Sequence, residues 1–183
     1  MKVTPLVLPD VLLLEPQVHG DARGFFVESY NRRTFARATG LDVDFVQDNH
    51  SRSARHVLRG LHYQLPPAAQ GKLVRVLHGE IYDVAVDLRR SSPTFGRWIG
   101  QRLDAAGFQQ LWIPPGFAHG FIALSEHADI AYKTTAHYHP ELERVLAWND
   151  PHLAIAWPLH GHPPITSPRD AAGQAWADCP TFP

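Results

Sequence analysis

The feature of this sequence that most restricts its fold is a succession of short strand-like stretches separated by turn residues. The chain has 183 residues, of which 16 are prolines, and prolines interrupt helices and end strands. Many short strands at fairly even spacing are typical of a β-sandwich or a β-barrel. We expect strands over residues 11–18, 24–30, 42–49, 57–64, 72–79, 80–89, 97–103, 110–114, 120–124, 129–138 and 143–148.

Helical signals are confined to two short segments. Residues 31–40 begin with Asn31, a suitable N-cap, and end with Gly40, which can take the left-handed conformation just past a helix. A second short helix is expected near residues 169–176, within a turn-rich C-terminal tail. The pattern predicts an all-β fold with a few short peripheral helices.

The composition predicts one domain that spans residues 1–183. Hydrophobic residues make up 44% of the chain and charged residues 19%, which is enough apolar material for a core. The formal net charge of −1 creates no field that would attract nucleic acid or a membrane surface. The N-terminal segment is interrupted by prolines and lacks the pattern of a signal peptide or membrane span. Together with a single cysteine, Cys179, these features predict a cytoplasmic protein.

The alternation of side chains along a strand predicts which residues share a face. Phe26 and Glu28 are two residues apart, as are Gln47 and Asn49, so each pair should point to one side of its strand. Residues 81–86 are largely apolar without alternation, which is typical of a strand buried on both faces.

The stretch "VLRGLHYQLPP", residues 57–67, carries Arg59 and His62 in one strand-like segment. A regular strand would direct these two side chains to opposite faces, because their numbers differ by three. Gly60 lies between them, and a bulge there can turn both side chains toward one cavity. His62 then has three interpretations: a metal ligand, a packed core histidine, or a catalytic base.

Two segments, residues 60–87 and 111–121, resemble the conserved motifs of the cupin superfamily, which has a jelly-roll fold. The second segment contains the pattern P-x-G-x-x-H, which ends at His119. Metal-binding cupins place two histidines one residue apart in the first motif, followed by a carboxylate. Here the residue two positions after His62 is Gln64, so too few ligands remain and no metal site is predicted.

A closer resemblance covers most of the chain, from about Gly24 to Asp170. Its segments occur in this order: RGFFVESYN, FVQDNHSRS, VLRGLHYQ, QGKLVRV, GEIYDVAVDLR, SPTFGRW, LWIPPGFAHGF, YKTTAHYHPELER and WNDP. Their sequences and order resemble the dTDP-4-dehydrorhamnose 3,5-epimerase family. This resemblance implies a cupin-type antiparallel jelly-roll sandwich.

The resemblance also implies a chemistry. The family's substrate is a nucleotide-linked 4-keto-6-deoxyhexose, whose ketone acidifies the neighbouring carbons C3 and C5. Epimerisation needs a base, an acid on the opposite side and a charge that stabilises the enolate oxygen, and it needs neither a metal nor another cofactor. By resemblance, His62 is the base, paired with Asp170, and Lys72 stabilises the enolate, while Tyr132 is the acid. The family usually has a lysine before this aspartate, where this chain has Arg169.

The same resemblance implies which residues hold the dTDP-sugar. Arginines suit its phosphates because a guanidinium group binds them with two hydrogen bonds. No Gly-rich phosphate loop opens a helix, so a nucleotide site of that kind is not predicted. The family's "RGFFVE" segment reaches into the neighbouring subunit's site, which implies a homodimer. The expected substrate-binding residues are Arg23, Phe26, Glu28, Gln47, Asn49, Arg59, His119, Tyr138 and Glu143.

Other conspicuous residues have structural interpretations. Asp83 is expected to support the site from the strand below, near Lys72. The tryptophans expected in the core or an interface are Trp98, Trp112, Trp148 and Trp157. The histidines expected in solvated loops are His137, His139, His152, His160 and His162.

Two alternative functions stay open. One is an epimerase that acts at C3 only or at C5 only, and the presence of both Tyr132 and Tyr138 favours the double epimerase over it. The other is a sugar-binding cupin without catalysis or a metal-dependent oxygenase. The missing second histidine argues against the oxygenase. The four residues whose co-occurrence argues against binding alone are His62, Lys72, Tyr132 and Asp170.

Overall fold

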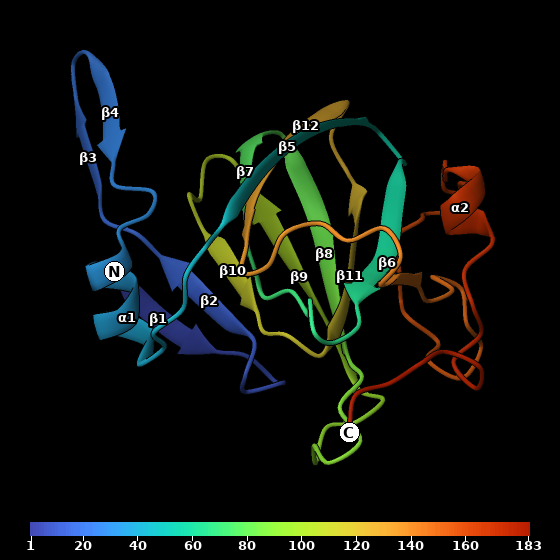
Figure 1. The fold of residues 1–183 in the computed structure, drawn as a ribbon. Coiled ribbons are helices and arrows are strands. Elements are labelled where there is room, and N and C mark those ends of the chain that lie inside the picture. The colour runs from blue at the N-terminus through green and yellow to red at the C-terminus, as the bar shows by residue number, and fades with distance from the viewer.

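The computed structural model describes residues 1–183 and contains two large antiparallel sheets that face each other (Figure 1). In each sheet, strands that are distant in sequence lie side by side, as in a jelly roll. The six-stranded sheet contains, in spatial order, β1 (Lys2–Pro5), β2 (Leu12–Glu15), β10 (Gln110–Ile113), β7 (Lys72–His78), β12 (His127–Thr134) and β5 (Gln47–Ala54). The five-stranded sheet contains β13 (Glu143–Val145), β6 (Leu58–Gln64), β11 (Phe117–Ala123), β8 (Glu80–Asp87) and β9 (Trp98–Asp104).

The core lies on both faces of the five-stranded sheet. Between the sheets, Ile81 and Ala85 of β8 pack with Val74 and Ile130 from the opposite sheet. On the other face, Val84 and Val86 pack against residues of the C-terminal tail. The strand predicted to be buried on both faces is therefore confirmed, and so is the predicted all-β jelly-roll sandwich with short peripheral helices.

Two helices lie outside the sandwich (Figure 1). Helix α1 (Arg32–Thr39) is capped as predicted, since the Asn31 side chain accepts hydrogen bonds from two backbone amides and Gly40 is left-handed. Its Phe35 packs against Trp112 on the outer face of the six-stranded sheet. Helix α2 (Pro168–Ala171) is shorter than the predicted segment 169–176, because the backbone at Gln174 is extended and pairs with Leu146 instead. Neither helix is long and apolar enough to cross a membrane.

A hairpin of β3 (Val18–Asp21) and β4 (Gly24–Val27) projects away from the two sheets (Figure 1). Two predictions about this part of the chain were wrong. The expected strand 11–18 is divided, because Pro16 follows β2 and a separate strand begins at Val18. Phe26 and Glu28 do not share a strand face, because β4 ends at Val27 where its pairing with Val18 ends.

Strand β5 was predicted over residues 42–49 but occupies Gln47–Ala54. Its pairing with β12 runs from Gln47 opposite Thr134 to Ala54 opposite His127. Pairing with a distant strand sets these limits, which the local pattern did not show. The prediction that Gln47 and Asn49 share a face is confirmed, because the Gln47 amide donates to Asn49 Oδ1 at 2.9 Å.

Gly60 forms the bulge that the three-residue spacing predicted. His62 pairs with His119 and Arg59 pairs with Phe121, so β6 has one more residue than β11 between these pairs. Gly60 has φ of 130°, and a Cβ atom there would lie 2.6 Å from Gly120 Cα. Only glycine fits this close approach.

The structural interpretations of tryptophans and histidines are confirmed. Trp112 and Trp157 are buried, and Trp98 and Trp148 pack against the outer core of the five-stranded sheet. The five histidines assigned to loops are all exposed. The turn-rich tail is also part of the core, because Cys179 and Phe182 are buried in it.

Candidate active site

A cavity of about 250 Å³ lies between the two sheets and brings together most of the predicted catalytic residues. Strands of both sheets contribute to its walls. It is lined by Ser51, Arg59, His62, Lys72, His119, Gly120, Phe121, Tyr132 and Glu143.

The bulge at Gly60 determines what enters this cavity from β6. Leu58 and Leu61 point into the outer core, whereas Arg59 and His62 both line the cavity. The extra residue changes the alternation between positions 59 and 62. The predicted common orientation of Arg59 and His62 is therefore confirmed.

His62 forms a hydrogen-bonded pair with Asp170, with Nε2 and Oδ1 2.5 Å apart. Helix α2 carries Asp170 to this position, and its capping residue Ser167 donates to Asp170 Oδ2 at 2.8 Å. Burial raises the pKa of Asp170, but the hydrogen bond and charge of His62, with help from Ser167, outweigh it and leave the pKa below its ordinary value. Asp170 is therefore a carboxylate that fixes the orientation of the imidazole ring.

Lys72 is buried and its Nζ atom donates to the backbone carbonyl of His62 at 3.2 Å. Burial lowers the pKa of Lys72 to about 8, and the negative charges of Glu143 and Asp83 oppose this shift only in part. At neutral pH the ammonium group is a buried cation beside His62.

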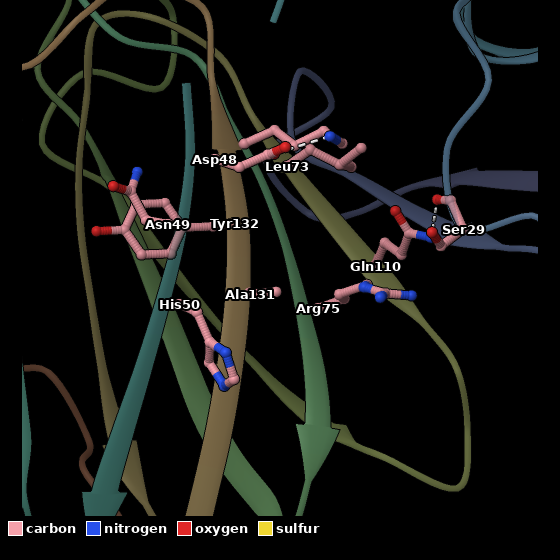
Figure 2. Close-up of a pocket in the computed structure, with 10 residues that line it drawn as sticks. Ser29, Asp48, Asn49, His50, Leu73, Arg75, Gln110, Ala131 and Tyr132 are labelled. Carbon is pink, nitrogen blue, oxygen red and sulfur yellow. Dashed lines mark hydrogen bonds and ion pairs between the residues drawn. The ribbon is translucent and has the colours of Figure 1, made fainter. Parts of the chain in front are cut away.

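Tyr132 lines the cavity from β12, in the sheet opposite to that of His62. Figure 2 shows its ring beside Asn49, the residue with which it pairs across β5 and β12. Burial raises the pKa of the Tyr132 hydroxyl, and the charge of Glu143 adds to this effect. The hydroxyl group therefore keeps its proton through the neutral range.

His119 and Asp83 form a second buried pair in the cavity wall. The His119 Nε2 atom lies 2.9 Å and 3.0 Å from the two carboxylate oxygens of Asp83. Burial lowers the pKa of His119 although Asp83 raises it, and the neighbouring charges of Lys72 and His62 lower it further. Asp83 lies near enough to Lys72 to act on its pKa, as expected, and its hydrogen-bond partner is His119.

A polar cluster lies at the rim of the cavity around Glu143. The Tyr138 hydroxyl donates to Glu143 Oε2 at 2.7 Å, and an Arg169 nitrogen lies 2.5 Å from the same oxygen. The Tyr138 backbone N–H donates to Gln47 Oε1 at 3.0 Å. Nearly half of the Tyr138 surface is exposed, so one face of its ring is open to a ligand.

Gln64, at the position where metal cupins have a histidine, has a structural role here. Its amide nitrogen donates to the carbonyls of Ala68 and His137, and its oxygen accepts from the His139 N–H. Both ends of the side chain hold the loop that carries Tyr138. In the chain as a whole, no three His, Cys, Asp or Glu side chains are grouped as metal ligands.

Three of the predicted binding residues lie in or next to the projecting hairpin, away from this cavity. Arg23 pairs with Asp21 within the hairpin, and Phe26 is 68% exposed. Glu28 accepts hydrogen bonds from Asn31 and from the Thr34 hydroxyl. The structure therefore does not bring Arg23, Phe26 and Glu28 to their own chain's cavity.

A larger hollow, of about 390 Å³, lies beside the same strands, and Figure 2 shows its lining residues. It shares Asn49 and Tyr132 with the predicted site, but none of its other lining residues is a predicted catalytic residue. Its ion pair joins Lys133 to Asp48, whose side chain is 72% exposed, so this pair is not a buried acid and base. We assign the candidate active site to the smaller cavity because His62, Lys72 and Tyr132, three of the four predicted catalytic residues, converge there.

Sequence reasoning did not identify Ser51 or Ser167. Ser167 forms a detectable N-cap pattern with the helix that follows, but its second role at Asp170 depends on the folded tail. Ser51 lies two residues after Asn49, so the same alternation that placed Asn49 could have placed Ser51 on its face.

The jelly-roll cavity has proton donors and acceptors on both of its walls. This arrangement is typical of one class of protein, a cupin-type enzyme that moves protons to and from a bound carbon acid. The sequence model of the dTDP-4-dehydrorhamnose 3,5-epimerase family matches residues 5–178. The chain belongs to this family, and it is a carbohydrate epimerase of the isomerase class.

Individual relatives support the same family assignment. The dTDP-4-dehydrorhamnose 3,5-epimerase of Pseudomonas aeruginosa is 61% identical over 183 residues, which is 100% of both chains. The Legionella pneumophila epimerase RmlC, solved with dTDP-4-keto-L-rhamnose, is 50% identical with a TM-score of 0.91, covering 95% of this chain and 92% of its own. ChmJ, a 3′-monoepimerase from Streptomyces bikiniensis solved with dTDP-quinovose, is 35% identical with a TM-score of 0.88, covering 97% of this chain and 88% of its own.

Proposed function

We propose that this enzyme converts dTDP-4-dehydro-6-deoxyglucose to dTDP-4-dehydrorhamnose by inverting C3 and C5, with His62 as base and Tyr132 as acid. The observation that carries this proposal is their placement. His62 belongs to the five-stranded sheet and Tyr132 to the six-stranded sheet, and both line one cavity. A sugar bound between the sheets therefore meets a proton acceptor on one face and a proton donor on the other, as inversion requires.

The base is the His62 ring nitrogen that does not face Asp170. When Nε2 carries a proton and donates it to the Asp170 carboxylate, Nδ1 keeps its lone pair. Removal of the proton next to the ketone then makes His62 an imidazolium ion, which the carboxylate stabilises. Ser167 holds Asp170 in the orientation that this step requires.

Lys72 stabilises the negative charge that develops on the C4 oxygen. A positioned donor of this kind contributes roughly 2.7–4 kcal/mol to transition-state stabilisation in other enzymes. The effect is large in a buried site, because little water competes for the charge. The buried lysine beside His62 matches this task.

Tyr132 returns a proton from the opposite face. Its raised pKa keeps the hydroxyl group protonated until the enolate forms. C3 and C5 are the two carbons next to the same ketone. One base and one acid can therefore serve both carbons if the sugar shifts between two positions in the cavity. Protons and electrons balance without any other reactant, because each carbon loses one proton and regains one.

The nucleotide end of the substrate extends from the sugar to the rim. Arg59, held by Ser53 and by the Arg52 carbonyl, faces the phosphates. The exposed Tyr138 ring stacks on thymine. The further groups that we assign to substrate binding in this chain are His119 for the sugar, and Gln47, Asn49 and Glu143 for the nucleoside.

Residues 1–183 form one domain in this proposal, and two copies form a homodimer. The hairpin of β3 and β4, which carries Arg23 in its turn and Phe26 in β4, projects from the sandwich (Figure 1), and Phe26 is exposed. In a dimer these residues and Glu28 complete the partner's site and cover the exposed edge. The free thiol of Cys179 is consistent with a reducing compartment, and we assign the enzyme to the cytoplasm.

Isotope exchange tests this function. The enzyme is incubated with dTDP-4-keto-6-deoxyglucose in heavy water, and the sugar is followed by NMR. We expect deuterium at both C3 and C5, whereas label at one carbon identifies a single epimerase like ChmJ. His62→Ala should abolish the exchange while the control His162→Ala, an exposed loop variant, leaves it unchanged. Exchange at a near-normal rate in His62→Ala would exclude His62 as the base.

A further inference from the structure

Ser51 is the residue of the cavity that has a buried side-chain oxygen without a hydrogen-bond partner in the chain. Its Oγ atom is the one buried side-chain oxygen or nitrogen in residues 1–183 without a hydrogen bond. It lies on β5 and lines the cavity together with His62, Lys72 and Tyr132. The residue opposite it on β12 is the apolar Ile130, which offers no side-chain partner.

The neighbours of Ser51 on the same strand face are all paired. The Gln47 amide donates to Asn49, and the Ser53 hydroxyl accepts from Arg59 Nε at 3.0 Å. Ser51 lies between these two pairs. Alternate residues on a strand are about 6–7 Å apart, so Ser51 and the guanidinium group held by Ser53 can reach the same group of a ligand.

We propose that the Ser51 hydroxyl donates a hydrogen bond to an oxygen of the phosphate that carries the sugar, next to Arg59. The inference rests on the proposed function, because it assumes a dTDP-sugar in this cavity. A phosphate oxygen only accepts, and a serine hydroxyl carries one proton to donate. Of the two phosphates, the sugar-linked one lies closer to the carbons that His62 and Tyr132 approach.

The energetic signature of a ligand contact differs from that of a structural one. A buried hydroxyl without a partner destabilises the free protein, since it has lost its hydrogen bonds to water. Ser51→Ala removes this group and should leave the melting temperature of the free protein unchanged or higher. A serine that stabilised the fold would show the opposite effect.

The experiment measures the affinity of Ser51→Ala and wild-type protein for dTDP and dTMP by calorimetry, with thermal unfolding of the free proteins. Hydrogen bonds to charged groups are strong, so we expect dTDP binding to weaken about tenfold or more. Binding of dTMP, which lacks the second phosphate, should change less than twofold. Ser91→Ala, on a loop remote from the cavity, is the matched control.

Any other result for Ser51→Ala overturns the assignment of its hydroxyl to the sugar-linked phosphate. Unchanged dTDP binding with a lower kcat/KM on the full substrate assigns Ser51 to the sugar instead. Equal losses for dTMP and dTDP, or a melting temperature lowered by several degrees, indicate a different contact or a structural role. Failure of the wild-type protein itself to bind dTDP contradicts the proposed function rather than the role of Ser51.

Discussion

His62 Nε2 and Asp170 Oδ1 lie 2.5 Å apart although 108 residues separate them in the sequence. Asp170→Asn keeps the size of the side chain but removes the charge that stabilises imidazolium. An amide can also donate to the ring, which favours the wrong tautomer. We therefore expect deuterium exchange at C3 and C5 to slow by about 10²–10⁴-fold, measured by NMR, with dTDP affinity unchanged.

The control for this substitution is Asp178→Asn, an identical change at an exposed position of the tail. It should leave exchange at the wild-type rate. If Asp170→Asn retains more than a tenth of that rate, Asp170 does not activate His62.

The lowered pKa of Lys72 should set the pH above which the activity declines. Burial lowers the pKa of Lys72 to about 8, so the cation that stabilises the enolate is lost as the pH rises through that value. We expect kcat/KM to fall above about pH 8. Lys72→Met should lower kcat by roughly 10²–10³-fold and remove this decline from the residual activity. A residual profile with the same alkaline decline would mean that another group titrates.

The same substitution should stabilise the free protein. The ordinary pKa of lysine is 10.5, so between about pH 8 and 10.5 the unfolded chain binds the proton that folded Lys72 has released. Stability therefore rises with pH across this window, and the full penalty of the buried charge is present below it. At pH 7 we expect Lys72→Met to raise the free energy of unfolding by roughly 1–3 kcal/mol in a denaturant titration.

This gain should disappear above pH 10.5, where lysine is neutral in both states. Lys2→Met, at a lysine whose side chain is 72% exposed, provides the control and should give no gain at pH 7. A loss of stability in Lys72→Met at pH 7 would show that the lysine is structural.

Tyr132→Phe should separate exchange from inversion. The variant keeps His62, so a proton can still leave and return on the same face of the sugar. We expect deuterium to enter with retention, while net epimerisation falls by about 10²–10⁴-fold. NMR of the sugar coupling pattern distinguishes the two. The control is Tyr82→Phe, whose ring packs against Trp157 outside the cavity and should have little effect on either rate. Inversion at a normal rate would exclude Tyr132 as the acid.

Local sequence patterns were sufficient to predict the structural features that depend only on neighbouring residues. Alternation predicted the common face of Gln47 and Asn49, and the spacing around Gly60 predicted the bulge that turns Arg59 and His62 together. Each of these features needs only a few adjacent positions, because the strand period and the conformational freedom of glycine are local properties.

Features that depend on distant pairing were not predictable from local patterns. β4 ends at Val27, and β5 begins five residues later than expected, because partner strands set these limits. The contact between His62 and Asp170 was expected only from the family resemblance, since the tail must fold back onto the sheet. The lack of a partner for the Ser51 hydroxyl also depends on the folded chain, because distant strands determine which polar groups lie around it.

The projecting hairpin predicts that two defective variants can restore each other. One variant carries Arg23→Ala and Phe26→Ala in the hairpin, and the other carries His62→Ala in the cavity. If each site combines one chain's cavity with the other chain's hairpin, a mixed dimer contains one site without any substitution and one site with all of them. Random pairing after co-expression at equal levels makes half of the dimers mixed, so we expect about a quarter of the wild-type exchange rate. Each variant alone should be nearly inactive in exchange. A mixture no more active than the separate variants would show that the hairpin serves its own chain or no site at all.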